Sequence, residues 1–126
     1  MKSIFSKSWK SSKQPRKQRK YRFNAPAHLK RKFLSVNLSK ELKTKYKKRN
    51  VPIVKGDSVK VMSGQFKKRT GKVSRVDYQN LKIYIEGIEN IKKDGNKVQL
   101  PITPSNLMII TLKLDDKKRL VSLERK

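Results

Sequence analysis

The sequence predicts a mainly β protein: a small antiparallel barrel with a basic N-terminal extension containing two short helices, and a short C-terminal helix. Three observations carry this prediction. Hydrophobic residues make up 34% of the 126 residues, below the roughly 45–50% of an average domain, so the core must be small. Apolar residues alternate with polar ones only after Val51, and short alternating runs are typical of strands. Residues 1–50 hold 18 Lys or Arg and a single acid, Glu41.

The arm at the start of the chain is basic and poor in apolar groups. Its first 22 residues show no apolar period of 2 or 3.6, and their large apolar groups are Ile4, Phe5, Trp9 and Tyr21. These groups bury too little surface to offset chain entropy, so we expect the arm to be disordered or extended when free. The four expected segments are a basic extended arm at 1–24, a short helical segment at 25–50, the barrel at 51–112 and a basic tail at 113–126.

Two short helices are predicted after the arm. Asn24 is suited to cap a helix at 25–33, with Pro26 in the first turn, where its missing N–H costs nothing. Ser39 is suited to cap a second helix at 40–47, where an acid near the start and lysines near the end match the helix dipole. Both helices have thin apolar stripes, so we expect them to need a surface on which to dock.

Five short strands are predicted after Val51, a series that is typical of a small antiparallel barrel. The clearest is 81–86, where Leu81, Ile83 and Ile85 alternate with polar positions. The second strand carries two valines three residues apart, which predicts a bulge or a sharp bend. We expect the last strand, an apolar run, to be buried on both faces. The five strands cover residues 58–61, 72–78, 81–86, 98–100 and 107–112.

Turn residues separate these strands, because Gly, Asn and Asp tolerate the backbone angles that tight turns require. A last basic helix is predicted at 117–125, with Asp115 or Asp116 as its cap. The predicted turn positions are Gly56, Asp57, Gly64, Gly71, Gln79-Asn80 and Asp94-Gly95.

The composition argues against several classes of function. No run of 18 apolar residues is present, which excludes a membrane span, and the first residues lack the apolar region of a secretory signal. The absence of cysteine excludes a disulfide scaffold and a thiol nucleophile and indicates a reducing compartment such as the cytoplasm. The single histidine, His28, has no acid near it in the sequence. We therefore expect no enzyme, metal, cofactor, small-molecule substrate or membrane insertion.

Residues 54–73 resemble a KOW motif, which joins two strands of an SH3-like barrel through a basic, glycine-containing loop. Further segments resemble, in the same order, the universal large-subunit ribosomal protein family numbered twenty-four, in its archaeal and eukaryotic form (numbered twenty-six in eukaryotes). These segments are 16–20, 23–26, 38–42, 83–87, 104–109 and 123–125. Two positions depart from the family: Lys68 stands where glycine is usual, and Thr70 where an acid or Gln is usual.

The resemblance implies a structural protein of the large ribosomal subunit in the cytoplasm. It implies binding to the 5′ domain of the large-subunit rRNA early in assembly and a position near the exit of the nascent-peptide tunnel. Neighbouring large-subunit ribosomal proteins and factors that dock at the tunnel exit are the implied protein partners. Three alternatives stay open: a free KOW-domain regulator of transcription or translation, a chromatin-type DNA binder, and a membrane-active cationic protein, which the lack of a strong apolar helix face disfavours.

The charge supports a nucleic-acid partner independently of this resemblance. A net charge of +26 creates strong self-repulsion, and a polyanion relieves it because each phosphate contact releases counterions. Aromatic side chains among the cations are suited to stack on unpaired bases, although Tyr21 and Phe23 have the alternative of packing within the protein. The residues that we expect to contact RNA are Lys10, Lys13, Arg16, Lys17, Arg19, Lys20, Tyr21, Arg22, Phe23, His28, Lys30, Arg31, Lys32, Lys67, Lys68, Arg69 and Lys72.

Overall fold

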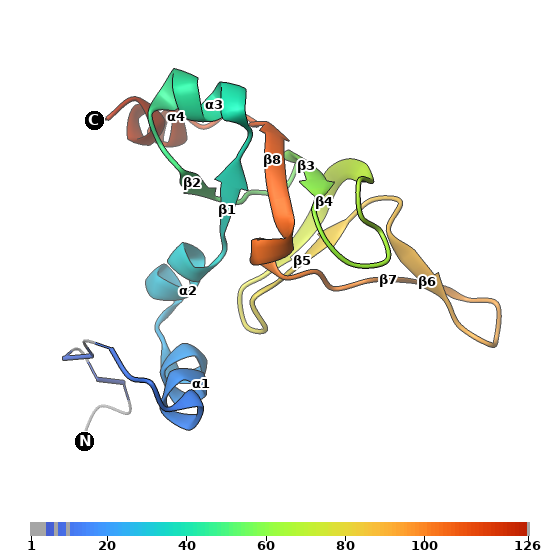
Figure 1. The fold of residues 1–126 in the computed structure, drawn as a ribbon, viewed down its shortest axis with the longest axis horizontal. Helices are drawn as coiled ribbons and strands as arrows, with labels where there is room; N and C mark the ends of the chain where they lie inside the picture. Colours follow the sequence, from blue (N-terminus) through green and yellow to red (C-terminus); the bar gives the residue numbers. More distant parts are fainter. Residues whose placement is uncertain (1–4, 7, 10, 126) are drawn as a thin grey trace.

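A computed structural model describes residues 5–6, 8–9 and 11–125, which form helices arranged around an open, mixed β-sheet (Figure 1). The helices of this part of the chain are α1 (Pro15–Asn24), α2 (Ala27–Phe33), α3 (Lys40–Tyr46) and α4 (Lys117–Glu124). The strands are β1 (Ser35–Leu38), β2 (Asn50–Pro52), β3 (Ser58–Val61), β4 (Thr70–Asp77), β5 (Lys82–Ile85), β6 (Glu89–Ile91), β7 (Lys97–Gln99) and β8 (Leu107–Thr111). A short 3-10 helix, η1 (Pro104–Asn106), precedes β8.

The sheet has the strand order β2-β1-β8-β3-β4-β5, and β6 pairs with β7 in a separate two-stranded ribbon. β1 runs parallel to β8, whereas the other neighbouring strands are antiparallel. The predicted β-rich class is confirmed, but the antiparallel barrel is not, because the sheet is mixed and open. The parallel pair comes from β1, which we did not predict, although Ser35–Leu38 alternates polar and apolar residues as β3 does.

The core lies on one face of the sheet, where alternate side chains of the strands meet. Val59 and Val61 of β3 are buried, as are Ile83 and Ile85 of β5. This alternation confirms the predicted strands at 58–61 and 81–86 in all but their ends. Leu81 lies outside β5, in a turn where its φ is 55°, and its side chain packs against the edge of the core.

β8 is buried on one face only. Its residues Leu107 and Ile109 are fully buried, but Ile110 is 39% exposed. The expectation that this run is buried on both faces is therefore wrong. A run of apolar residues is compatible with a strand buried on one face and with a strand buried on both faces. The composition of the run alone therefore does not distinguish the two arrangements.

β4 contains the irregularity that its sequence predicts. The register against β5 shifts between Val73 and Arg75, which confirms that the strand is irregular at this point. Gly71, however, lies within β4 and not in a turn as expected. A Cβ at this position would lie 2.6 Å from the carbonyl oxygen of Glu86. Glycine is therefore required here because two backbone segments approach closely, and positive φ plays no part.

The expected extended arm is wrong for residues 15–24, because these residues form α1. Tyr21 of α1 stacks on Trp9 with ring centroids 4.6 Å apart, and Phe5 and Phe33 lie 4.9 and 6.0 Å from the same ring. The helix thus gains apolar contacts from rings outside it, which a search for periodicity within the segment does not detect. Asn24 ends α1 and caps no helix, although the predicted helix that follows is present as α2.

The other two helices begin at their predicted caps. The Ser39 hydroxyl accepts a hydrogen bond from the Leu42 N–H at 3.4 Å, and an Asp116 carboxylate oxygen accepts one from the Lys118 N–H at 2.9 Å. α3 and α4 lie at the same end of the molecule (Figure 1), and the Lys48 ammonium, just after α3, donates a hydrogen bond to the carbonyl oxygen of Ser122 in α4. Leu42 and Tyr46 of α3 pack against the core, and Leu123 of α4 is part of it, so the core is the surface on which both helices dock.

A buried ion pair joins α4 to the sheet. Arg119 Nη1 and Nη2 donate to the two carboxylate oxygens of Asp57 at 2.7 and 2.6 Å. The same carboxylate accepts the backbone N–H groups of Val54 at 3.0 Å and Lys113 at 2.9 Å. Asp57 is fully buried, so the residue that we assigned to a turn also connects the loop before β3 with the segment after β8.

The β6–β7 ribbon projects away from the sheet (Figure 1). Its turn contains the predicted Asp94-Gly95 pair, and the φ of Gly95 is 81°. β6 was not predicted because residues 89–91 are all exposed and show no alternation. The described part of the chain contains no helix long and apolar enough to cross a membrane.

The loop between β3 and β4 has two positions in the left-handed region of the backbone map. Gly64 has a φ of 89°, as the preference of glycine allows, but Lys68 also has a φ of 73°. The Lys68 N–H donates to the Val61 carbonyl oxygen at 2.8 Å, so this strained residue closes the loop. An L-residue in this region costs of order 1–2 kcal/mol relative to its relaxed form.

Removing one partner of the buried pair should destabilise the fold strongly. Asp57→Ala or Arg119→Ala is expected to lower the free energy of unfolding by about 3–5 kcal/mol, because the remaining charge is left buried without its partner. The double variant should lose clearly less than both single losses together. Urea denaturation followed by circular dichroism measures these differences. Asp115→Ala, which removes an exposed ion pair with Lys113, is the control and should change stability by less than about 1 kcal/mol.

Replacing the strained loop residue Lys68 by glycine should stabilise the fold, in contrast to the substitutions in the buried ion pair. Lys68→Gly is expected to raise the free energy of unfolding by up to about 1 kcal/mol, because the relief of strain exceeds the added freedom of the unfolded chain. Lys67→Gly is the matched control, since Lys67 has no positive φ, and it should lower stability slightly. Thermal melting of both variants compares them, and equal losses would show that Lys68 carries no strain.

Candidate nucleic-acid interface

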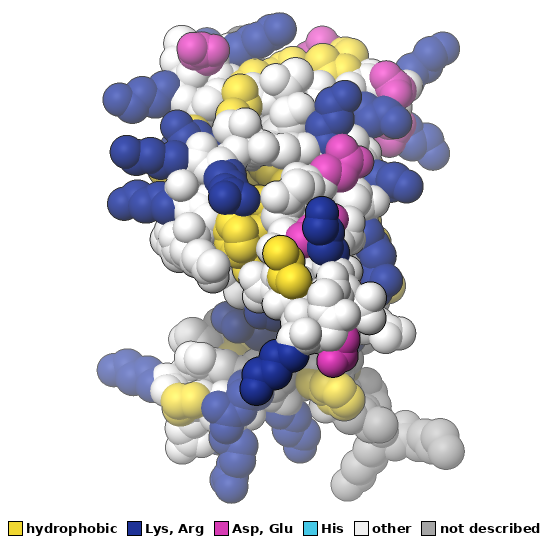
Figure 2. All heavy atoms as spheres, turned by 90° about the vertical axis from the view of Figure 1, so that its right-hand side faces the viewer, with side chains coloured by type: hydrophobic (Ala, Val, Ile, Leu, Met, Phe, Trp, Pro, Cys, Tyr) yellow, Lys and Arg dark blue, Asp and Glu magenta, His cyan; other side chains and the backbone are white. Residues whose placement is uncertain are grey.

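Most of the described cations have no carboxylate partner. Within the described part of the chain, ion pairs join Arg119 to Asp57, Arg75 to Asp77 at 4.0 Å and Lys113 to Asp115 at 3.2 Å. Figure 2 shows Lys and Arg side chains projecting around one face, with fewer acidic side chains between them. Such uncompensated positive charge at the surface attracts phosphate groups.

α1 arranges the cations of the arm on its surface. The predicted contacts at Lys13, Arg16, Lys17, Arg19, Lys20 and Arg22 are all exposed, and Lys10 lies outside the described residues. At about 100° per residue, Arg16, Arg19 and Lys20 fall on the same side of the helix as Phe23. Tyr21 falls on the other side, toward the aromatic cluster. The helix therefore presents a charged face with one aromatic ring on it.

The structure separates the two aromatic residues that the sequence left with alternative roles. Tyr21 packs within the protein, through its contacts with Trp9 and Phe33. Phe23 is 80% exposed, and Lys30 Nζ lies over its ring, 6.0 Å from the ring centroid. Phe23 therefore remains available to a partner, whereas Tyr21 is a structural residue.

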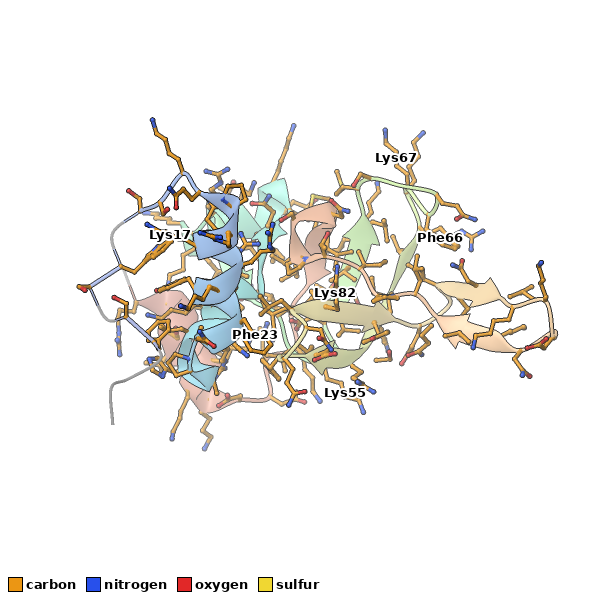
Figure 3. The ribbon with its side chains drawn as sticks, turned by 90° about the horizontal axis from the view of Figure 1, so that it is seen from below. Lys17, Phe23, Lys55, Phe66, Lys67 and Lys82 are labelled. Carbon is orange, nitrogen blue, oxygen red and sulfur yellow. The ribbon has the colours of Figure 1, made fainter. Side chains whose placement is uncertain are left out.

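A groove of about 440 Å³ lies between α1 and the turn that joins β4 to β5. Arg19, Arg22 and Lys82 contribute its positive charge, and Phe23 and Phe33 contribute its aromatic surface. No acidic side chain of the described residues lines this groove. Figure 3 shows Lys82 on its strand and Phe23 near the end of α1. Lys82 was not predicted, because alternation places it on the solvent side of its strand without indicating what lies opposite.

The turn at one side of the groove is held by Asp77. Its carboxylate accepts hydrogen bonds from the Asn80 side chain at 2.9 Å and from the backbone N–H groups of Asn80 and Gln79 at 3.1 and 3.0 Å. These hydrogen bonds, the one from the Asn80 side chain foremost, lower the pKa of Asp77 below its ordinary value. The turn that carries Gln79 and Asn80 into the groove is therefore fixed by bonds within itself.

A second groove, of about 550 Å³, separates α2 from β2 and α4. It brings His28, Arg31 and Lys32 of α2 together with Lys48 and Lys118. The run at residues 30–32 is thus divided, since Lys30 lies near Phe23 while its two neighbours line this second groove. The contribution from α4 could not be predicted, because these residues are about ninety positions apart in the sequence.

The loop between β3 and β4 forms a third basic area. Lys67, Lys68 and Arg69 of the loop are exposed, as is Lys72 of the adjoining β4, and Lys67 projects away from the molecule, well apart from α1 (Figure 3). The Arg69 guanidinium lies 5.0 Å from the ring of Phe66, which is buried. Arg69 therefore has a packing role in addition to its charge, whereas Lys67 has none that the structure shows.

The geometry thus provides three basic surfaces in the described part of the chain. Among residues 5–6, 8–9 and 11–125, no three His, Cys, Asp or Glu side chains converge as metal ligands would. His28 lines the second groove, where cations outnumber the acid of its lining, Asp116, and this surplus of positive charge suits anion binding. This arrangement can bind extended polyanions at several points at once.

Comparison with known protein families gives one match that covers most of the chain. Residues 12–126 match the model of the family that comprises the eukaryotic ribosomal proteins L26 and their archaeal counterparts, which are numbered twenty-four. The matched range includes all four helices and all eight strands of the described residues. The basic surfaces of α1, of the second groove and of the β3–β4 loop all lie within it.

Proposed function

The chain belongs to this family of ribosomal proteins, and from that premise we propose that it is a structural constituent of the large ribosomal subunit held in place by ribosomal RNA. The observation that carries the proposal is the family match over residues 12–126. The family is one of structural ribosomal components, and its members are not enzymes. The three basic surfaces agree with RNA as the principal partner.

We propose that each basic surface contacts a different stretch of RNA backbone. α1 presents Arg16, Arg19 and Lys20 on one side, and the β3–β4 loop presents Lys67 far from it. Arginine can form two parallel hydrogen bonds to one phosphate, whereas lysine acts as a point charge. Contacts at separate places neutralise phosphates of RNA segments that would otherwise repel one another, which is a role in holding folded RNA together.

The finer placement follows the family resemblance. We propose that the RNA is the 5′ domain of the large-subunit rRNA, bound early in assembly, and that the protein lies near the exit of the nascent-peptide tunnel in cytoplasmic ribosomes. Neighbouring large-subunit proteins and factors docking at the tunnel exit would then be its protein partners. The β6–β7 ribbon, which projects from the sheet (Figure 1), is suited to reach such neighbours.

Sedimentation through a sucrose gradient tests the proposed function. The protein should travel with large subunits and stay with them after treatment with DNase, but leave them after treatment with RNase. Recovery mainly in light fractions would contradict the proposal and favour a free regulator of transcription or translation. Release by DNase would instead indicate a DNA-bound protein.

Removing cations from α1 should flatten the salt dependence of RNA binding. We expect the triple change of Arg16, Arg19 and Lys20 to Gln to reduce the slope of log affinity against log salt by about 2–3, because each phosphate contact contributes about 0.7–0.9. Filter binding of purified large-subunit rRNA at several salt concentrations measures the slope. The matched variant changes Lys40, Lys43 and Lys45 of α3 to Gln and should reduce the slope by less than about 1; an equal reduction would mean that α1 has no special role.

Reversing charge in the β3–β4 loop should weaken RNA binding without unfolding the protein. Lys67→Glu with Lys72→Glu is expected to lower affinity for the same rRNA at least about tenfold, because two attractions become repulsions. The melting temperature should stay within a few degrees, because both side chains are exposed. Arg69→Glu is the contrasting variant, and it should also lower the melting temperature because its guanidinium packs on Phe66.

A further inference from the structure

We propose that the groove between α1 and the β4–β5 turn holds one unpaired nucleotide of RNA, with its base stacked on Phe23. This inference rests on the proposed function, since it assigns a part of the RNA to a particular site. It concerns base recognition, which the charge of the basic surfaces does not explain.

The exposure of Phe23 is the first observation. The ring is 80% exposed, with the Lys30 ammonium 6.0 Å from its centroid. By contrast, Phe5 and Phe33 meet the ring of Tyr21, and Phe66 is buried beside Arg69. An aromatic ring kept in water forgoes the contacts that such a side chain ordinarily makes. A base stacked on Phe23 would supply them, and bases of any identity can stack on an aromatic ring.

The positive charge of the groove favours a ligand that carries negative charge. Arg19 and Arg22 of α1 and Lys82 of β5 line it, with no carboxylate of the described residues among the lining groups. The closest acid along the chain, Asp77, already accepts three hydrogen bonds within its own turn. A nucleotide carries both an aromatic base and a phosphate, so it satisfies the ring and the cations of this groove together.

The size and the polar groups of the groove also suit a nucleotide. Its volume of about 440 Å³ falls within the roughly 300–1,000 Å³ of sites that enclose small ligands. Gln79 and Asn80 each bring a side-chain amide, which can donate and accept hydrogen bonds as the edge of a base does. The Asn80 amide nitrogen is held by Asp77, which leaves its oxygen to accept from a base.

An unpaired nucleotide fits better than a paired one. In an A-form duplex the bases are stacked inside, and the deep major groove does not admit protein side chains to read them. Phe23 lines a recess between α1 and the sheet, so a base must leave its own helix to reach the ring. Bulges, loops and ends of RNA supply such bases at little cost, because these bases are already unstacked.

The test compares two RNA hairpins of equal length in binding to the full chain, one fully paired and one with a single bulged 2-aminopurine. The unaltered protein should bind the bulged RNA more tightly and change the fluorescence of its 2-aminopurine. Phe23→Ala should weaken binding of the bulged RNA between about fivefold and 150-fold, abolish the fluorescence change and leave the affinity for the paired RNA unaltered. Phe23→Trp should restore both signals.

The control replaces another exposed ring, Tyr78→Ala, which lies outside the groove and should leave both affinities unchanged. Thermal melting of each variant checks that the fold is intact. Equal losses for both RNAs, or no loss for either, would overturn the assignment of the groove, even if the unaltered protein binds RNA tightly. Failure of the unaltered protein to bind either RNA at low salt would instead contradict the proposed function.

Discussion

Asp57 and Arg119 form the ion pair on which the arrangement of the sheet and the C-terminal helix depends. Both carboxylate oxygens of Asp57 accept from Arg119, and each also accepts a backbone N–H, from Lys113 and Val54 respectively. Arg119 donates in addition to the carbonyl oxygens of Lys113 and Pro52 at 2.7 and 3.4 Å. Burying two charges is costly unless their hydrogen bonds are made, and in this pair the buried Arg119 Nε lacks a partner among the described residues. The bonds that are made also specify where α4, β2 and the segment after β8 meet.

The placement of this pair explains how so basic a chain maintains a folded core. A net charge of +26 produces repulsion that opposes compaction. The protein confines charge inside the fold to one compensated pair and keeps its other described cations at the surface, where water and counterions screen them. The core is mainly aliphatic, built from alternate residues of short strands together with residues of the connecting segments and of α4, and Phe66 is its aromatic member. Bound RNA can then neutralise the surface cations without changing the packing of the core.

Aromatic residues divide between structure and recognition in the N-terminal region. Tyr21 holds α1 against rings that come from the preceding segment and from α2, whereas Phe23, two positions later, points away from that cluster. Two residues along a helix correspond to about 200°, so adjacent rings of one helix must face different partners. With this geometry, α1 is held to the protein through one face and exposes Phe23 on another. The basic groove beside Phe23 depends on that anchoring.

The sequence by itself determined the strands with clear alternation, the cap at Ser39, a cap at Asp115 or Asp116, an irregularity in β4 and the surplus of positive charge, because each of these depends on neighbours in the chain. Only the tertiary structure decided that β1 adds in parallel to an open sheet, that residues 15–24 form a helix on an aromatic cluster, and that Gly71 serves a close backbone approach. It also decided which cations line the same groove: Lys82 with Arg19 and Arg22 in the first groove, and Lys118 with Arg31 in the second. These outcomes depend on contacts between residues far apart in sequence, and the sequence carries no local periodic signal for such contacts.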